Sequence, residues 1–309
     1  MHANRTRRFQ RRRYWRNLVL AGGGTLLAGA LVIVIVVAIW SARLGVETLH
    51  PAQSAPERTP REVGIAIYED VAFVNGDGIT LRGWYVPPGN GAAILLAHGY
   101  GSNRDDLLDE AGLLAAHGYG VLLFDFGGHG TSDNALVTVG DRERRDLIAA
   151  LDFLSTQPDV DADRIGALGL SMGGAALALV ASEDARIRAV VIEAAFPTLE
   201  DVIADKAGLL GPLTTWPVRW AIEHEGVDVG AVRPVDALCA ISPRPLLLIY
   251  GDHDEVAPPG SAEAMFAAAC DPVERWLVPG AGHGSSFEIV PDAYGARLLR
   301  FFDAALSGD

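Results

Sequence analysis

Apolar residues are distributed unevenly along the chain, and the longest apolar stretch lies near its start. No charged residue occurs between Leu18 and Trp40. As a helix this run would be about 34 Å long, enough to cross a bilayer. A cleaved signal peptide would have an apolar core of only about 7–15 residues before a small-x-small site, and no such site directly follows Trp40. The pattern therefore predicts a transmembrane helix over residues 18–40.

After residue 60, short apolar runs alternate with stretches whose apolar residues recur at helical spacing. The helical pattern is clear in Arg104–His117, where the apolar side chains share one face. This alternation predicts a mostly parallel sheet covered by helices on both faces, in one α/β domain over residues 61–309. The expected strands include Ala93–Ala97, a run ending at Leu168, Ala189–Ile192, Pro245–Tyr250 and Val273–Val278.

An insertion over residues 197–242 separates two of these strands where a short connection would suffice. Two interpretations stay open: a small lid that shapes an apolar pocket, or a helical hairpin that packs its own aromatic residues. Its apolar residues are Leu209, Leu210, Leu213, Trp216, Val218 and Trp220.

Charge changes sign along the chain. A basic arm over residues 1–17 precedes the apolar run, and no acidic residue occurs before Glu47. Basic residues before a membrane span predict a cytoplasmic N-terminus and an outward-facing domain. Segment 41–60 contains three prolines, which predicts an extended spacer. The arginines of the arm are Arg5, Arg7, Arg8, Arg11, Arg12, Arg13 and Arg16.

The whole chain has a formal net charge of -14 despite that basic arm. So acidic a domain is not expected to bind nucleic acid. We interpret the charge as a solubilising surface, with repulsion of anionic substrates or lipid surfaces as the alternative.

Two cysteines, Cys239 and Cys270, fall in the part of the chain expected outside the cytoplasm, where disulfides persist. In a strand-helix-strand unit both would lie at the same edge of the sheet. The sequence leaves open a disulfide or two free thiols.

The segment Gly169–Gly173, with the sequence GLSMG, joins an expected strand to an expected helix. Such a turn leaves little room for side chains beside its central serine and exposes the hydroxyl at the helix N-terminus. This pattern predicts that Ser171 is a nucleophile, and the alternative is that it only caps the following helix.

Candidates for the acid and the histidine follow Ser171 along the chain, so that the order is serine, acid, histidine. Each lies at the end of an expected strand. His283 lies in a glycine-rich loop after the last strand, and Asp252, Asp254 and Glu193 are the candidate acids. The remaining histidines are interpreted as structural or remote. For His253, which lies between two acids, a metal site is not expected because three adjacent residues cannot all point inward.

The chain contains the motifs HGYGSN at 98–103, DFGGHGTS at 125–132, GLSMGG at 169–174, GDHDEVAP at 251–258 and GAGHG at 280–284. These five motifs give it a resemblance to the α/β-hydrolase superfamily, most of all to bacterial serine aminopeptidase-like and Bem46-like hydrolases. The resemblance covers Val71–Leu306 and implies a mostly parallel eight-stranded sheet. One departure is Gly127, where many relatives have arginine, which leaves the conformation of that loop open.

The resemblance implies a role for each site residue. Ser171 is the nucleophile, His283 the base and Asp254 the acid that orients it, while Asp252 forms a turn. The backbone N–H groups of Met172 and Tyr100 would form the oxyanion hole. No cofactor and no metal ion are expected.

The expected function is a membrane-anchored serine hydrolase that cleaves a small-molecule ester, thioester or amide through an acyl-enzyme. A serine peptidase acting on short peptides and a non-catalytic binding protein of the same fold are the alternatives. Since His283 must be neutral to act as a base, activity should fall as pH drops through about 6–7, the usual range for histidine.

Overall fold

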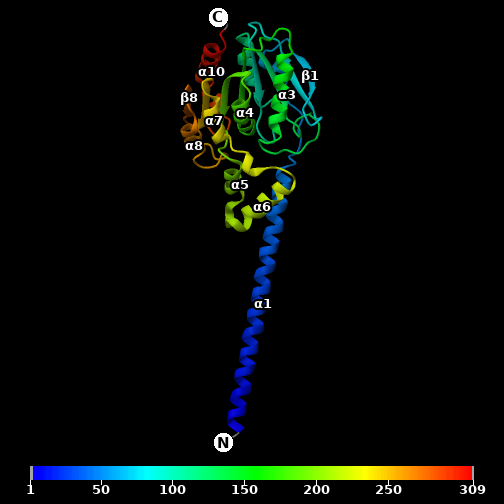
Figure 1. Cartoon of the computed structure of the whole chain (residues 1–309), viewed down its shortest axis with the longest axis vertical. Coiled ribbons are helices and arrows are strands. Elements are labelled where there is room, and N and C mark those ends of the chain that lie inside the picture. The colour runs from blue at the N-terminus through cyan, green and yellow to red at the C-terminus, as the bar shows by residue number, and fades with distance from the viewer. Residues whose placement is uncertain (1–2, 308–309) are drawn as a thin grey trace.

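Eight strands form one mixed sheet in the computed structural model, which describes residues 3–307 (Figure 1). The strand order is β1-β2-β4-β3-β5-β6-β7-β8. At one edge, β2 runs antiparallel to both of its neighbours, β1 and β4. All strands from β3 to β8 run parallel to one another. The strands are β1 (Glu69–Val74), β2 (Thr80–Val86), β3 (Ala93–Ala97), β4 (Gly120–Asp125), β5 (Ile165–Leu170), β6 (Ile187–Glu193), β7 (Leu246–Gly251) and β8 (Val273–Val278).

Helices cover both faces of this sheet. α3, α4, α7 and α8 pack on one face, and α2 and α10 pack on the other. The α-helices are α1 (Ala3–Thr48), α2 (Leu108–Ala116), α3 (Glu143–Ser155), α4 (Met172–Glu183), α5 (Leu199–Ala207), α6 (Pro212–His224), α7 (Pro234–Ile241), α8 (Ser261–Ala268), α9 (Ser286–Ile289) and α10 (Pro291–Leu306). Short 3₁₀ turns are η1 (Pro60–Val63), η2 (Gly208–Leu210) and η3 (Val229–Ala231).

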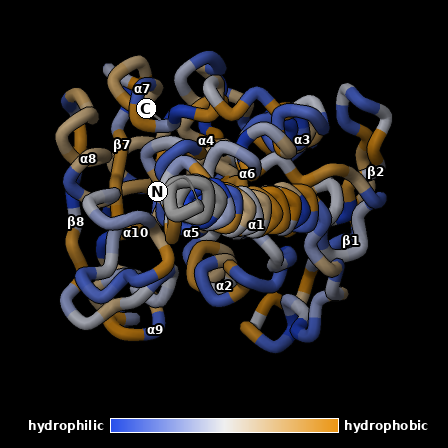
Figure 2. Tube along the Cα trace, turned by 90° about the horizontal axis from the view of Figure 1, so that it is seen from below, coloured by the Kyte–Doolittle hydropathy of each residue, from blue (hydrophilic) through white to orange (hydrophobic). Residues whose placement is uncertain are grey.

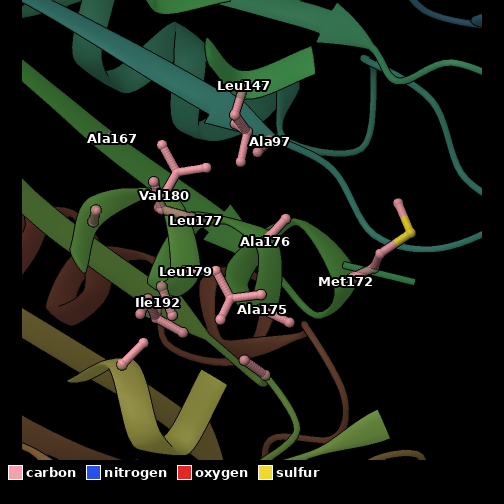
Figure 3. Close-up of a cluster of buried hydrophobic side chains, with 14 of the residues drawn as sticks. Ala97, Leu147, Ala167, Met172, Ala175, Ala176, Leu177, Leu179, Val180 and Ile192 are labelled. Carbon is pink, nitrogen blue, oxygen red and sulfur yellow. The ribbon is translucent and has the colours of Figure 1, made fainter. Parts of the chain in front are cut away.

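The central strands are apolar along their whole length because side chains on both faces are covered. Every residue of β3, β4, β5 and β7 is buried. Figure 3 shows part of this core, where Leu177 and Val180 of α4 lie near Ala167 of β5 and Leu147 of α3. The expected α/β-hydrolase fold with a mostly parallel eight-stranded sheet is confirmed. The expected helix from Arg104 begins four residues later, at Leu108.

The first helix, α1, projects far from the domain (Figure 1). Its segment Arg11–Thr48 is long and apolar enough to be a candidate membrane span. Side chains from Leu18 to Val36 are exposed, so no protein surface covers them. The expected basic arm, residues 1–17, belongs to the same helix from Ala3 onward, and its first two residues lie outside the described part of the chain.

The prediction that residues 41–60 form an extended spacer is wrong for its first part. α1 continues without a break to Thr48, and Ser41, Gly45 and Leu49 form a buried stripe at helical i, i+4 spacing. The first proline of the segment is Pro51, so nothing before it interrupts the helix. Tertiary packing against α6 holds this end of the helix, since a Cβ at Gly45 would lie only 2.8 Å from the Val218 carbonyl oxygen.

The rest of that segment, from residue 51 to 59, has no regular structure but follows the domain surface. The side chain of Gln53 donates to the carbonyl oxygens of His129 and Ser132. Arg58 forms an ion pair with Asp109 at 2.8 Å. The segment is therefore attached to the domain along its length and does not separate α1 from it.

Candidate active site

Ser171 lies between β5 and α4 in the tight turn that the sequence predicts. Its backbone has φ 53° and ψ -114°, a conformation that L residues rarely adopt. Its neighbours leave no space for side chains, because a Cβ at Gly169 would lie 2.6 Å from the Gly173 carbonyl oxygen. The Ser171 N–H donates to the Glu193 carbonyl oxygen of β6 at 2.8 Å. The sheet thus fixes the turn and raises the serine hydroxyl above the ends of the strands.

The structure brings Ser171, His283 and Asp254 together from three separate loops. His283 Nε2 lies 2.9 Å from Ser171 Oγ, and His283 Nδ1 lies 2.9 Å from Asp254 Oδ2. With Nδ1–H donating to the carboxylate, Nε2 is left to accept the serine proton. The side chains of His283 and Asp254 are only 19% and 7% exposed, so these bonds are largely protected from water.

The environment of Asp254 keeps its carboxyl charged. Burial alone would raise its pKa, but hydrogen bonds from His283 and from the N–H groups of Ala257 and Val256 outweigh burial. The net effect lowers the pKa of Asp254 below its ordinary value. The partner of His283 is therefore an anion throughout the range in which histidines titrate.

The two other candidate acids have different partners. Asp252 accepts from the Gly280 N–H at 2.6 Å, which holds two adjoining loops together, as a turn-forming residue would. Glu193 is buried at the end of β6 and accepts from the hydroxyl of Tyr294 at 2.7 Å. Among the described hydrogen bonds, the acid partner of His283 is Asp254 alone.

Tyr100 and Met172, the expected oxyanion donors, flank the serine. Met172 is the first residue of α4, whose initial N–H groups have no partner within the helix. Within residues 3–307, neither the Tyr100 N–H nor the Met172 N–H donates to a protein acceptor. The loop that carries Tyr100 is held on both sides, by Asp106 accepting from Gly99 and by His129 Nε2 accepting from Gly101.

His98 and His129 support this loop as neutral hydrogen-bonding groups, in agreement with the structural interpretation of both. His98 Nε2 accepts from the Phe126 N–H at 3.1 Å. Burial lowers the pKa of His98, and it lowers the pKa of His129 to about 4. Both rings are therefore uncharged at neutral pH, so each Nε2 can accept from a backbone N–H.

The loop at Gly127, where many relatives have arginine, is held by a carboxyl group instead. The Gly127 N–H donates to Asp146 Oδ2 at 2.9 Å, and Asn75 donates to the other oxygen of that carboxyl. Burial raises the pKa of Asp146 to about 7. The loop therefore keeps an ordered conformation without the arginine.

An apolar cavity of about 200 Å³ lies beside Ser171 and His283. Tyr100 and Met172 form the wall near the serine, and Val202 and Lys206 of α5 cover it from the insertion. The insertion therefore borders the cavity as the lid interpretation expects. The hairpin interpretation, in which its aromatic residues pack together, is wrong, because Trp216 and Trp220 are 67% and 51% exposed.

One wall of the cavity comes from α1, which no sequence pattern places there. Thr48, the last residue of α1, lines the cavity, and its carbonyl oxygen accepts from the Tyr100 hydroxyl at 2.7 Å. Lys206 donates to the Val256 carbonyl oxygen at 2.8 Å and so joins the insertion to the loop that carries Asp254. Neither contact has a sequence motif, because each depends on how distant elements pack.

The two cysteines form a disulfide, which decides between the two alternatives left by the sequence. Cys239 of α7 and Cys270, which lies just before β8, have Cα atoms 4.6 Å apart. The bridge joins the segments that flank β7 on the side away from the catalytic loops.

Comparisons with known proteins agree with this fold. The prolyl oligopeptidase family matches residues 107–309. An uncharacterized protein of Mycobacterium tuberculosis is 32% identical over 69% of this chain and 72% of its own. The alpha/beta hydrolase domain-containing protein WAV2 of Arabidopsis thaliana is 27% identical over 80% of each chain.

A solved structure gives the same result. An esterase of Pyrococcus furiosus superposes with a TM-score of 0.69 at 26% identity, covering 83% of this chain and all of the esterase. With a family match over most of the domain and a relative above 30% identity, the chain belongs to the prolyl oligopeptidase family of the α/β-hydrolase superfamily.

Proposed function

We propose that this hydrolase is a serine esterase that cleaves carboxylic esters through an acyl-enzyme. The observation that carries the proposal is the pair of 2.9 Å hydrogen bonds linking Asp254, His283 and Ser171 beside an apolar cavity. A serine hydroxyl is a weak nucleophile alone and needs a base within hydrogen-bond reach, oriented by a third group.

The proposed reaction has two halves. His283 Nε2 takes the Ser171 proton as Oγ attacks the substrate carbonyl carbon, and the Met172 and Tyr100 N–H groups stabilise the resulting oxyanion. His283 then protonates the leaving oxygen as the ester bond breaks. In the second half, His283 activates a water molecule that hydrolyses the acyl-enzyme and releases the acid. Asp254 stays ionised and stabilises the imidazolium in both halves.

The cavity favours an uncharged acyl group over a peptide with a free N-terminus. Among the described residues that line it, none is a carboxylate that would bind an α-amino group, and the charge of Lys206 is paired with Asp205 at 2.9 Å. Peptide cleavage is the second candidate, because the matching family is named for an oligopeptidase. Thioesters remain within the same mechanism, since it requires only an activated acyl carbonyl.

We also propose that the apolar run of α1 anchors the enzyme in a membrane with its N-terminus in the cytoplasm. Trp15 and Trp40 flank the run, as aromatic residues do at the two interfaces of a bilayer. The arginines that precede it favour the cytoplasmic side.

The proposal is tested by labelling the full chain, held in lipid nanodiscs, with a fluorophosphonate probe. Wild type should be labelled and Ser171→Ala should not, because the probe reacts only with an activated serine. Ser182→Ala, at the other end of α4, is the matched control and should label like wild type. Absence of labelling in folded wild type would favour a binding protein instead.

Turnover of esters and peptide amides then distinguishes the two candidates and tests the acid. Asp254→Asn should lower kcat by about 10²–10⁴-fold, because the neutral amide no longer fixes the tautomer of His283. Asp252→Asn, two residues away, should stay within a few fold of wild type. Equal losses in both variants would contradict the assignment of Asp254, and cleavage of peptides but not esters would favour the peptidase.

A further inference from the structure

The insertion carries an apolar surface whose side chains stay at least half exposed in the described protein. On α6, Leu213, Trp216 and Trp220 follow one another at i, i+3 and i+7, so they share one helical face. η2 adds two leucines beside them. We call these five residues the apolar cap face, and their exposed fractions are 92% for Leu209, 50% for Leu210, 53% for Leu213, 67% for Trp216 and 51% for Trp220.

The opposite face of α6 is occupied by α1. Thr214, Pro217, Val218, Ala221 and Ile222 of α6 are buried, and the Val218 backbone lies against Gly45 of α1. The catalytic cavity is covered by α5 and not by the apolar cap face. The apolar cap face therefore stays largely exposed and does not line the cavity, and its Trp220 ring stacks on His224 of the same helix.

The position of α6 along α1 indicates what this face meets. The exposed apolar run of α1 ends at Trp40, and the contact at Gly45 lies about 8 Å further along the helix axis. The headgroup layer on one side of a bilayer is about 5–8 Å thick. Figure 1 shows α5 and α6 at the end of the domain from which α1 projects, and Figure 2 shows them beside α1 from that end.

We propose that the apolar cap face inserts into the headgroup layer of the bilayer that holds α1, on the side of the catalytic domain. The inference rests on the proposed membrane anchor. Tryptophan and leucine side chains on one face of a short helix are typical of helices that lie in a membrane interface. Because α6 packs on α1 just beyond the apolar run, the apolar cap face would lie at the level of the headgroup layer.

The charge of α5 and α6 favours a lipid surface without net charge over an anionic one. α5 and α6 carry Glu200, Asp201, Asp205 and Glu223 against Lys206 and Arg219. An acidic cap is not attracted to anionic lipids, so insertion depends on apolar contact and should persist in zwitterionic bilayers and at high salt. A second copy of the chain is the competing occupant, and the experiment below separates the two.

Insertion would place the catalytic cavity close to membrane-borne substrates. Thr48, which lines the cavity, lies about 12 Å along α1 from Trp40, only a little beyond the headgroup layer. An ester carried by a lipid would then need to rise only a short way to reach Ser171.

The test uses tryptophan fluorescence of the full chain in zwitterionic nanodiscs whose acyl chains are brominated near the carbonyl. The variant Trp15→Phe/Trp40→Phe lacks the two anchor tryptophans. It keeps Trp216 and Trp220 of α6, together with Trp84 and Trp276 of the sheet. Bromine should quench this variant by about a third or more relative to unbrominated discs. Adding Trp216→Phe/Trp220→Phe should abolish the quenching.

Each outcome decides the inference without reference to catalysis. Absence of quenching in the variant that keeps Trp216 and Trp220, while the chain elutes with the discs, would overturn insertion and leave the anchor intact. In that case, two chains per disc would indicate a second copy as the occupant. A chain that does not elute with the discs would overturn the anchor and the insertion together, and fluorophosphonate labelling would still report separately on the serine.

Discussion

Glu110 is a carboxyl on the buried face of α2, only 6% exposed. Burial, with the nearby Glu193 carboxyl as the next cause, raises the pKa of Glu110 to about 8 from an ordinary value of 4.5. The folded protein therefore holds a proton at neutral pH that the unfolded chain releases. Folding stability must then decrease as pH rises from about 4.5 to 8.

Glu110→Gln should remove this pH dependence, because an amide is a neutral isostere of the protonated acid. The gain in free energy of unfolding should be on the order of 3 kcal/mol larger at pH 8 than at pH 5. Thermal unfolding at the two pH values measures it. The exposed Glu288→Gln serves as a control and should show no such difference, and an equal effect of Glu110→Gln at both pH values would contradict the argument.

The catalytic candidates could be predicted from sequence because each lies in a motif whose backbone geometry dictates its residues. The glycines around Ser171 and the loops after β7 and β8 carry that information locally. Thr48 could not be predicted, since it lines the cavity only because α1 remains helical past Trp40 and packs on α6. Its residue type carries no chemical signal.

The central strands were predicted well because full burial makes their sequence continuously apolar. β3 has the expected bounds, and β7 begins and ends one residue later than expected. The edge strand β8 also has the expected bounds, although it is only partly buried. The end of α1 was not predicted, because the three prolines after residue 50 suggested an extended segment and the small residues Ser41 and Gly45 carry no helix signal by themselves. Packing against α6 decides the conformation there, and packing is not visible in local sequence.

The contact between α1 and α6 should be sensitive to the size of residue 45. Gly45→Leu would force the two helices apart, because its Cβ alone would lie 2.8 Å from the Val218 carbonyl oxygen. Overpacking of this kind typically costs about 1–3 kcal/mol. Thermal unfolding in nanodiscs should show it. Gly29→Leu, on the same helix with nothing within 4 Å, should leave the melting temperature unchanged, and equal behaviour of the two variants would contradict the packing.

For the molecule as a whole, the disulfide between Cys239 and Cys270 closes a loop across a sequence separation of 31 residues. A bridge of this length stabilises mainly by restricting the unfolded chain, by about 3–4 kcal/mol in the chain-entropy description. Cys239→Ser/Cys270→Ser should therefore unfold at a lower denaturant concentration than wild type. Reductant should lower the wild-type midpoint and leave that of the double variant unchanged; a wild-type midpoint insensitive to reductant would contradict the expectation.

If α1 spans a bilayer as proposed, its unbroken path from the apolar run to Thr48 links the orientation of the whole domain to that bilayer. The run is about 34 Å long, and a hydrocarbon layer of about 30 Å accommodates a longer helix by tilting it. Because α1 is one continuous helix as far as Thr48 in the cavity wall, a tilt of the helix would tilt the domain with it. Bilayer thickness would thus set the angle at which the cavity meets the membrane, so that hydrophobic mismatch becomes a variable of substrate access.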